Sequence, residues 1–231
     1  MRDFEFQIGD YCHVFNRGAG KQVIYQDQND YKRFYQSLFL FNSATFKNTG
    51  GHTDMRDDVL LEMIDKSEPE REPFVEIISY CLLPNHFHLL LKQVRPDGIP
   101  IFLHKLSMGY SKYFNLRHKR SGTLYEGTYK AVLVEREGHL EHLPRYIHLN
   151  ALDTTSVDWR NHPVNDWSRV KMILDSYPWS SHHVYAGGQE PLRVIHTAEI
   201  KKWFPETDAY WNYIKEWVGT SLSDVPTADD L

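Results

Sequence analysis

The chain has 231 residues, of which 41% are hydrophobic and 14% aromatic, so it can bury a full core and is not a disordered polymer. No apolar run approaches the roughly 18 residues that a membrane-spanning helix needs, so we expect a cytoplasmic protein with no membrane partner. The formal net charge is -5, but residues 80–150 carry ten Lys and Arg against five Asp and Glu, so a polyanionic partner is not excluded.

The first predicted elements form a β-α unit. Residues 11–17 have the composition of a strand and end at the glycine loop 18–20, and a helix is predicted over 30–43. Residues 44–73 contain Gly, Pro and many charged side chains, with a short acidic helix predicted over 57–64. We interpret this stretch as an acidic insertion between core elements, because it cannot cover much apolar surface.

The central part of the chain is predicted to contain three further strand segments and two helices. Apolar runs at 74–83 and 86–93 are separated by Pro84-Asn85, which predicts two strands joined by a tight turn. The elements predicted after them are a helix over 99–117, a bent strand or hairpin over 123–135, and a helix over 138–149. The order β-α-β-β-α-β predicts an α+β fold, a ferredoxin-like antiparallel sheet with helices on one face.

We expect one domain over residues 1–185 and a C-terminal helical extension over 186–231. Short helical stretches are predicted in this extension, around 200–204 and 208–218. The sequence leaves three roles open for the extension: a lid, an appendage that recognises the substrate, or a packing element.

Two histidines lie in the strand predicted over 86–93. Because alternate side chains of a strand share a face, His86 and His88 are predicted to point to the same side. Two neutral imidazoles held at a fixed separation can bind a divalent metal ion. In a chain with 13 histidines, two histidines on a half-solvated strand face are also a common occurrence, so the pair alone leaves both interpretations open.

Tyr146 and Asn150 are four residues apart in the helix predicted over 138–149, so they occupy adjacent turns of one face. The amide oxygen of Asn150 could be a third ligand to a metal held by two imidazoles, and Tyr146 would then lie near a phosphate that the metal polarises. A nearby cation favours the phenolate, and its attack would give a covalent phosphotyrosine and a 3′-hydroxyl. With 14 tyrosines present, a core aromatic is the alternative.

Five separated motifs occur in a fixed order along the chain. They are YCHVFNRG at 11–18, LPNHFHLL at 83–90, LYEG at 124–127, RYI followed by Asn150 at 145–150, and YPWSS at 177–181. In this order they resemble the single-tyrosine HUH transposases, and within that superfamily they are most similar to the REP-associated tyrosine transposases. The resemblance covers about residues 11–185.

The resemblance implies a catalytic domain over residues 1–185 that cleaves and rejoins single-stranded DNA through a 5′-phosphotyrosine, often beside a hairpin. It implies that Tyr146 is the nucleophile and that Mg²⁺ or Mn²⁺ is bound by His86 and His88, with Asn150 as the third ligand. Such a protein acts as a monomer or a homodimer.

Five basic residues are expected to contact DNA: Arg17, Lys105, Lys112, Lys130 and Arg145. For Arg17, a surface cation at a strand end is an equally good interpretation. Lys130 could replace the arginine that the family often has at the position of Thr128. His13 is expected to be a packed structural histidine rather than a metal ligand.

Two other functions remain open at this stage. A domesticated protein could bind hairpin DNA without turnover, and its DNA binding would then be indifferent to the substitution Tyr146→Phe. A metal-dependent hydrolase with a water nucleophile would never form a covalent protein–DNA adduct.

Overall fold

The computed structural model describes residues 4–46, 71–134, 137–160 and 164–218. The short helix predicted over 57–64 and most of the predicted acidic insertion lie outside the described residues.

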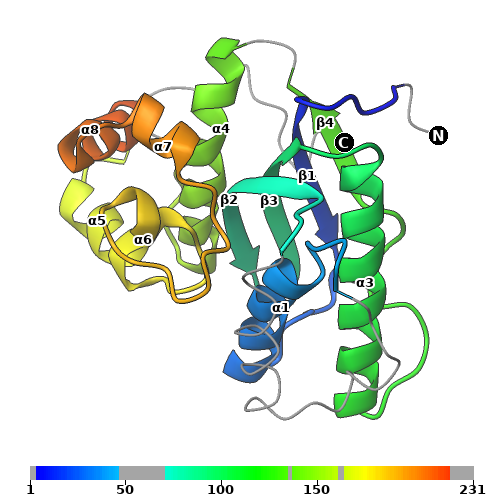
Figure 1. The fold of residues 1–231 in the computed structure, drawn as a ribbon. Helices are drawn as coiled ribbons and strands as arrows, with labels where there is room; N and C mark the ends of the chain where they lie inside the picture. The colour runs from blue at the N-terminus through cyan, green and yellow to red at the C-terminus, as the bar shows by residue number, and fades with distance from the viewer. Residues whose placement is uncertain (1–3, 47–70, 135–136, 161–163, 219–231) are drawn as a thin grey trace.

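Four strands form one antiparallel sheet in the order β2-β3-β1-β4 (Figure 1). The strands are β1 (Tyr11–Arg17), β2 (Val75–Leu83), β3 (His86–Gln93) and β4 (Lys130–Leu133). Helix α1 (Gln28–Leu40) comes between β1 and β2 in the chain, and α3 (Gly98–Arg117) comes between β3 and β4. The predicted β-α-β-β-α-β order and the ferredoxin-like antiparallel sheet are confirmed.

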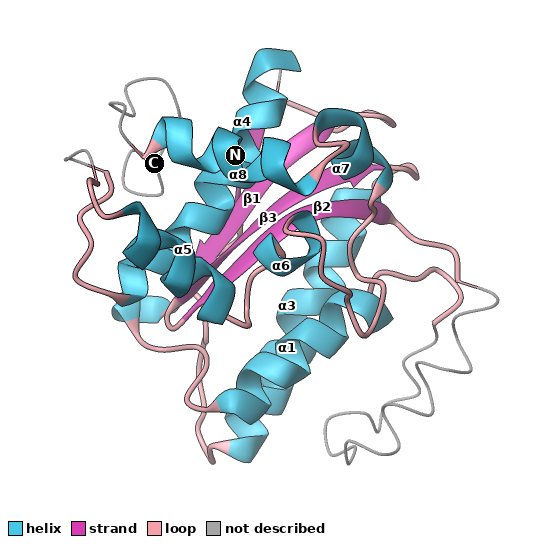
Figure 2. Cartoon of the chain, turned by 90° about the vertical axis from the view of Figure 1, so that its left-hand side faces the viewer, coloured by secondary structure: helices cyan, strands magenta, loops and turns pink. Residues whose placement is uncertain are grey.

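The two faces of the sheet are covered by different helices (Figure 2). Phe87 of β3 points toward α1, where its ring centroid lies 5.1 Å from that of Phe34. Because side chains alternate along a strand, His86 and His88 point to the opposite face. Helix α4 (Glu137–Leu149) packs on that opposite face, against β2 and β3.

After α4 the chain stays on the α4 side of the sheet and along its β2 edge (Figures 1 and 2). This part begins with a 3-10 helix, Asn150–Thr154, and continues with the helices α5 (Trp167–Ser176), α6 (His182–Tyr185), α7 (Ala198–Trp203) and α8 (Thr207–Trp217). Another 3-10 helix, Ala19–Lys21, follows β1. Backbone hydrogen bonds from Leu82 N to Trp179 O and from His196 N to Ile77 O, both 2.8 Å, attach this part to β2 and cover an edge strand. None of the described helices combines the length and the apolar character needed to cross a bilayer.

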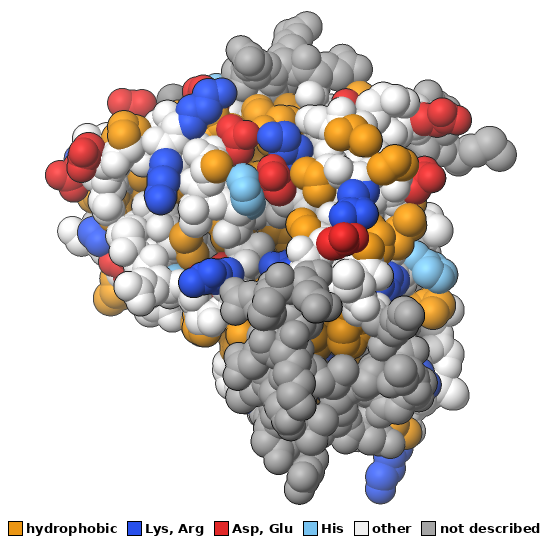
Figure 3. All heavy atoms as spheres, viewed as in Figure 1, with side chains coloured by type: hydrophobic (Ala, Val, Ile, Leu, Met, Phe, Trp, Pro, Cys, Tyr) orange, Lys and Arg blue, Asp and Glu red, His pale blue; other side chains and the backbone are white. Residues whose placement is uncertain are grey.

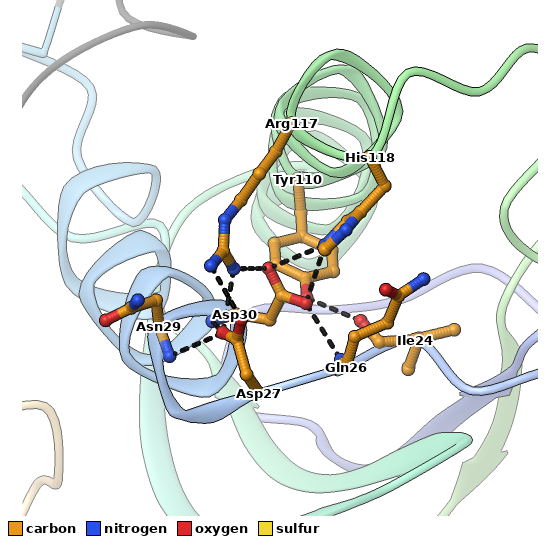
Figure 4. Close-up of polar contacts among 8 residues, drawn as sticks. All are labelled: Ile24, Gln26, Asp27, Asn29, Asp30, Tyr110, Arg117 and His118. Atoms are coloured by element: carbon orange, nitrogen blue, oxygen red, sulfur yellow. Dashed lines mark hydrogen bonds and ion pairs between the residues drawn. The ribbon is translucent and has the colours of Figure 1, made fainter.

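A buried carboxylate ties α1 to the end of α3 (Figure 4). Asp30 is fully buried and accepts hydrogen bonds from the Arg117 guanidinium and, at 2.8 Å, from the backbone N–H of Gln26. The imidazole of His118 lies 2.9 Å from the same carboxylate. Asp27 caps the N-terminus of α1 and also pairs with Arg117. The network fixes the relative position of the two helices that support the sheet on the Phe87 side.

The turn between β2 and β3 is held by the loop that follows β1. Gly18 N donates to Asn85 O, and Ile24 N donates to Pro84 O, both at 2.8 Å. A Cβ atom at Gly18 would lie 2.2 Å from Gln22 O, so only glycine fits this close approach. The predicted turn at Pro84-Asn85 is confirmed, and it fixes where β3 begins.

The structure differs from the predicted elements in two places. The bent strand or hairpin predicted over 123–135 is confirmed in part: Lys130–Leu133 forms a strand, and before it Tyr125 makes only an isolated antiparallel bridge with Gly18, beside the 2.9 Å bond from Ala19 N to Leu124 O. The glycines at positions 122 and 127 interrupt a regular ladder there. Helices α5 and α6 have no counterpart among the predicted elements, because only Val170 and Leu174 of the α5 side chains are buried and α6 has only four residues.

Candidate active site

The predicted His pair lies on the face of the sheet that α4 covers. His86 and His88 point to the same side of β3, as strand periodicity predicts, and their ring centroids are 5.1 Å apart. His88 is fully buried, whereas His86 is partly exposed, and Nδ1 of His86 lies 2.7 Å from Oδ1 of Asn85. The pair therefore forms one wall of a site that is closed at His88 and open toward solvent at His86.

A third histidine contacts this pair from the neighbouring strand. Nε2 of His13 lies 3.0 Å from Nδ1 of His88, and the two rings meet edge to edge, with centroids 5.2 Å apart and an interplanar angle of 20°. Nε2 of His88 is buried and has no hydrogen-bond partner among the described residues. A buried ring nitrogen in this state is the position from which an imidazole can bind a metal ion, so the donor set fits a cation at His88.

Both buried imidazoles are held in the neutral form. Burial lowers the pKa of His13 to about 4. Burial also lowers the pKa of His88 well below its usual value, and the neighbouring charges of Arg160 and Arg17 act in the same direction. Neutral imidazoles are the form that ligates metal ions, because the protonated ring has no lone pair to offer.

Tyr146 of α4 packs directly on the histidines of its own chain. Its ring lies edge-on to His88 and His13, with centroid distances of 5.9 and 5.8 Å. The side chain is 0% exposed, and the indole ring of Trp159 lies on another side with a centroid distance of 6.0 Å. The structure thus brings the predicted nucleophile together with His88 of the predicted pair, from elements about sixty residues apart in the sequence.

Asn150 lies one turn beyond Tyr146, but its side chain is already bound within the protein. Its Nδ2 donates to the backbone oxygen of Tyr146 at 2.7 Å, and its Oδ1 accepts from Nη2 of Arg160 at 2.6 Å. Arg160 also pairs with Asp153 and lies over the ring of Trp159. The oxygen expected to be the third metal ligand is therefore bound to a guanidinium in this structure.

Sequence reasoning did not identify Arg160, because its contact with Asn150 depends on a loop that folds back over ten residues. Burial opposes the charged form of Arg160, but the hydrogen bond and the charge of Asp153 raise its pKa, and the Tyr146 phenol adds to this effect. The guanidinium is therefore a fixed positive charge beside the proposed nucleophile.

Two of the predicted DNA-binding residues lie on the His side of the sheet. Arg17 is the register partner of His86, and Lys130 is the register partner of Phe15, whose ring centroid is 5.7 Å from that of His88. The Nζ atom of Lys130 lies 5.9 Å from the centre of the Phe15 ring. Both cations therefore border the His pair.

The other three predicted DNA-binding residues lie elsewhere. Lys105 and Lys112 are on α3, in the layer on the opposite face of the sheet, and Nζ of Lys105 donates to Ser43 O at 3.0 Å. The Arg145 guanidinium lies 3.9 and 3.7 Å from the ring centres of Tyr213 and Trp217. DNA contact through Arg145 would require this packing of α8 against α4 to open.

Charges of both signs are mixed on the face of the molecule that is drawn in Figure 3. Figure 3 shows Lys and Arg side chains next to Asp and Glu side chains on this face, without one continuous positive area. Among the described residues, no group of three or more His, Cys, Asp and Glu side chains could hold a metal ion.

Comparison with known proteins adds sequence evidence for the central part of the chain. Residues 52–150, which include β2, β3, α3, β4 and α4, match the family model described as "Transposase IS200 like". A solved structure of a REP-associated tyrosine transposase bound to a REP hairpin is similar with a TM-score of 0.46 and 14% sequence identity, over 81% of this chain and 84% of that chain. No curated protein matches the sequence. The family model covers 99 of the 231 residues, so this part of the chain is similar to the IS200-like transposases.

Proposed function

We propose that this protein is a single-stranded DNA transesterase of the transposase type that cleaves and rejoins DNA through Tyr146. The family match supports a DNA-directed activity. The observation that carries the proposal is the packing of the Tyr146 ring on His88 and His13 within one chain. The five ordered sequence motifs favour the REP-associated branch, and with it a DNA substrate that carries a hairpin near the cleaved bond.

In the proposed reaction the phenolic oxygen of Tyr146 attacks a DNA phosphorus. One Tyr146 oxygen–phosphorus bond forms, and the bond between that phosphorus and the 3′-oxygen of the upstream nucleotide breaks. The phenol releases its proton, and the departing 3′-oxygen takes up a proton. Because one phosphate ester replaces another, a 3′-hydroxyl can later reverse the step and rejoin the strand.

The residues that would hold Mg²⁺ or Mn²⁺ are His86, His88 and Asn150. The buried Nε2 atom of His88, which has no hydrogen-bond partner among the described residues, supports this assignment. When bound there, a divalent ion would neutralise phosphate charge and favour the phenolate form of a nearby tyrosine. The Arg160 guanidinium already donates to the Asn150 oxygen, so an ion bound by that oxygen would lie close to a positive charge.

Access to Tyr146 requires a movement of the residues that cover it. The side chain is fully buried, with the ring of Trp159 on one side and the imidazole of His13 on another. His13 belongs to the central sheet, whereas Trp159 belongs to a loop after α4. The loop that carries Trp159 and Arg160 is therefore the element that we expect to move when DNA binds.

The test is covalent capture of DNA. Single-stranded oligonucleotides with a foldback hairpin and a 3′-terminal label are incubated with the protein and Mn²⁺, and the products are separated under denaturing conditions. We expect a labelled protein–DNA adduct, since the 5′-phosphate of the downstream fragment stays on Tyr146. The adduct should be absent in Tyr146→Phe and present in Tyr113→Phe, a matched control on the opposite face of the sheet.

The alternative is a hairpin-binding protein without turnover, and the complete burial of Tyr146 favours it. It predicts a DNA complex in a gel-shift assay that is identical for the parent protein and Tyr146→Phe. It also predicts no adduct with any oligonucleotide of a library that gives such a complex. That pair of results would exclude the transesterase.

A further inference from the structure

His13 is joined to the metal-facing histidine by a buried contact. The distance between Nε2 of His13 and Nδ1 of His88 is 3.0 Å, and both side chains are at most 2% exposed. One of the two nitrogens must donate and the other must accept. If His88 donates from Nδ1, its Nε2 keeps a lone pair; if His13 donates, His88 carries a proton on Nε2 and cannot ligate a metal.

Building on the proposed function, we propose that His13 is a positioning residue that keeps His88 in the tautomer able to ligate a metal. In that state His88 Nδ1–H donates to His13 Nε2, and the lone pair of His88 Nε2 faces the site. The two rings are nearly coplanar, with an interplanar angle of 20°, so the His88 Nδ1–H bond points along the lone pair of His13 Nε2 and this contact fixes the direction of the His88 ring as well. Outer partners of metal-binding histidines commonly act in this way, and their loss lowers metal affinity about 10–100-fold.

Binding of Mn²⁺ to the full chain, followed by the electron paramagnetic resonance signal of the free ion, tests this proposal without DNA. We expect His13→Leu to weaken Mn²⁺ binding about 10–100-fold. His13→Gln should retain most of the affinity, because its amide oxygen can accept from His88 Nδ1. Leu90→Val, at the register partner of His13, changes the same packing without this hydrogen bond and should bind Mn²⁺ as the parent does.

The outcomes separate this inference from the proposed function. If His88→Ala leaves Mn²⁺ binding unchanged, the metal site of the proposed function is wrong. Two results would overturn only the role of His13. In the first, His88→Ala abolishes Mn²⁺ binding but His13→Leu binds as the parent does. In the second, His88→Ala abolishes binding and His13→Gln binds Mn²⁺ no better than His13→Leu. Should His13→Leu fail to fold by circular dichroism, His13→Met removes the same acceptor and replaces it in the comparison.

A separate observation concerns Arg160. Its Nη2 atom holds Oδ1 of Asn150 at 2.6 Å, and its Nη1 atom pairs with Asp153, which lies one turn further along the chain. A guanidinium and a divalent ion cannot both bind the same amide oxygen along the same direction, and each repels the other. We infer that Arg160 competes with the metal ion for Asn150.

The same Mn²⁺ titration tests this competition, with an effect of the opposite sign. Arg160→Gln should raise the Mn²⁺ affinity about tenfold, the equivalent of one lost charged hydrogen bond. In the Asn150→Ala background, adding Arg160→Gln should no longer raise the Mn²⁺ affinity. An unchanged or lowered affinity in Arg160→Gln would overturn the competition. A gain that persists in the double variant would also overturn it, because it would then come from the removed charge alone.

Discussion

The basic side chains near the proposed site differ in what lies against them. The Arg145 guanidinium is held between the rings of Tyr213 and Trp217 and donates to Tyr213 O at 2.8 Å. Arg17 and Lys130 instead border the His pair on β1 and β4. A buried cation against aromatic rings stabilises the packing of helices, whereas an exposed cation such as Lys130 can meet a phosphate.

We therefore expect Lys130→Ala to weaken binding of single-stranded DNA and Arg145→Ala to leave its salt dependence unchanged. One lost phosphate contact should reduce the slope of log affinity against log salt concentration by about 0.7. Fluorescence anisotropy with a labelled oligonucleotide at four salt concentrations measures this slope. Arg145→Ala should instead lower the free energy of unfolding by about 2 kcal/mol, since a desolvated cation–π contact is lost. A reduced slope in Arg145→Ala would assign Arg145 to the DNA.

At the scale of the elements, α1 and α3 are joined by charge as well as by apolar packing. Asp30 is fully buried and contacts Arg117 and His118 at the C-terminal end of α3, as Figure 4 shows. The hydroxyl of Tyr110 donates to Ile24 O at 2.5 Å within the same region. These contacts hold the layer that supports β3 from the side opposite to the His pair.

Asp30→Asn should lower the free energy of unfolding by about 3 kcal/mol, because it removes one partner of a buried ion pair. Asp27→Asn is the matched control, because asparagine can still cap α1. The variant loses only the ion pair between Arg117 and a half-exposed carboxylate, so its free energy of unfolding should fall by less than about 1 kcal/mol. Urea denaturation of both variants measures the difference. Equal decreases in the free energy of unfolding would show that the buried carboxylate of Asp30 contributes no more to stability than the half-exposed one of Asp27.

At the scale of the whole molecule, the C-terminal part is docked on the helix that carries Tyr146. The Tyr210 hydroxyl of α8 lies 2.9 Å from Nδ1 of His148 and 2.7 Å from Nδ1 of His182, and all three side chains are buried. These contacts cross the predicted boundary between 1–185 and 186–231 and join α4, α6 and α8. They support the packing role among the three that the sequence leaves open.

This docking predicts a loss of stability at mildly acidic pH. Burial lowers the pKa of His182 to about 4 and that of His148 well below its usual value. Below about pH 6.5 the unfolded chain binds protons at these two positions that the folded chain does not bind, so the free energy of unfolding decreases as the pH falls toward about 4. For His182 alone the loss at pH 4.5, relative to pH 7, is about 2.5 kcal/mol.

Urea denaturation at pH 7.0, 5.5 and 4.5 measures this dependence. His182→Gln keeps a polar side chain without a titrating ring and should show a smaller decrease over the same interval. A decrease of the same size in His182→Gln would assign the acid sensitivity to other groups.

The sequence by itself determined the strands, the turn and the pairs of residues that share a face. β1 and β3 have the predicted bounds, and His86 and His88 share a face because side chains alternate with a period of two along a strand. Tyr146 and Asn150 lie on adjacent turns because of helical periodicity. All of these features follow from local geometry, which is fixed by backbone dihedral angles and spacing.

Only the tertiary structure decided which separated groups meet. Local periodicity places Lys105 and Lys112 on the basic side of a helix, but the packing of that helix puts them on the face away from His88. Tertiary packing also decided the surroundings of two arginines: α8 covers Arg145, and Arg160 donates a hydrogen bond to the side-chain oxygen of Asn150. Such contacts join residues far apart in the chain, and they depend on how helices dock on a sheet, which is set by the total burial of apolar surface rather than by any one spacing.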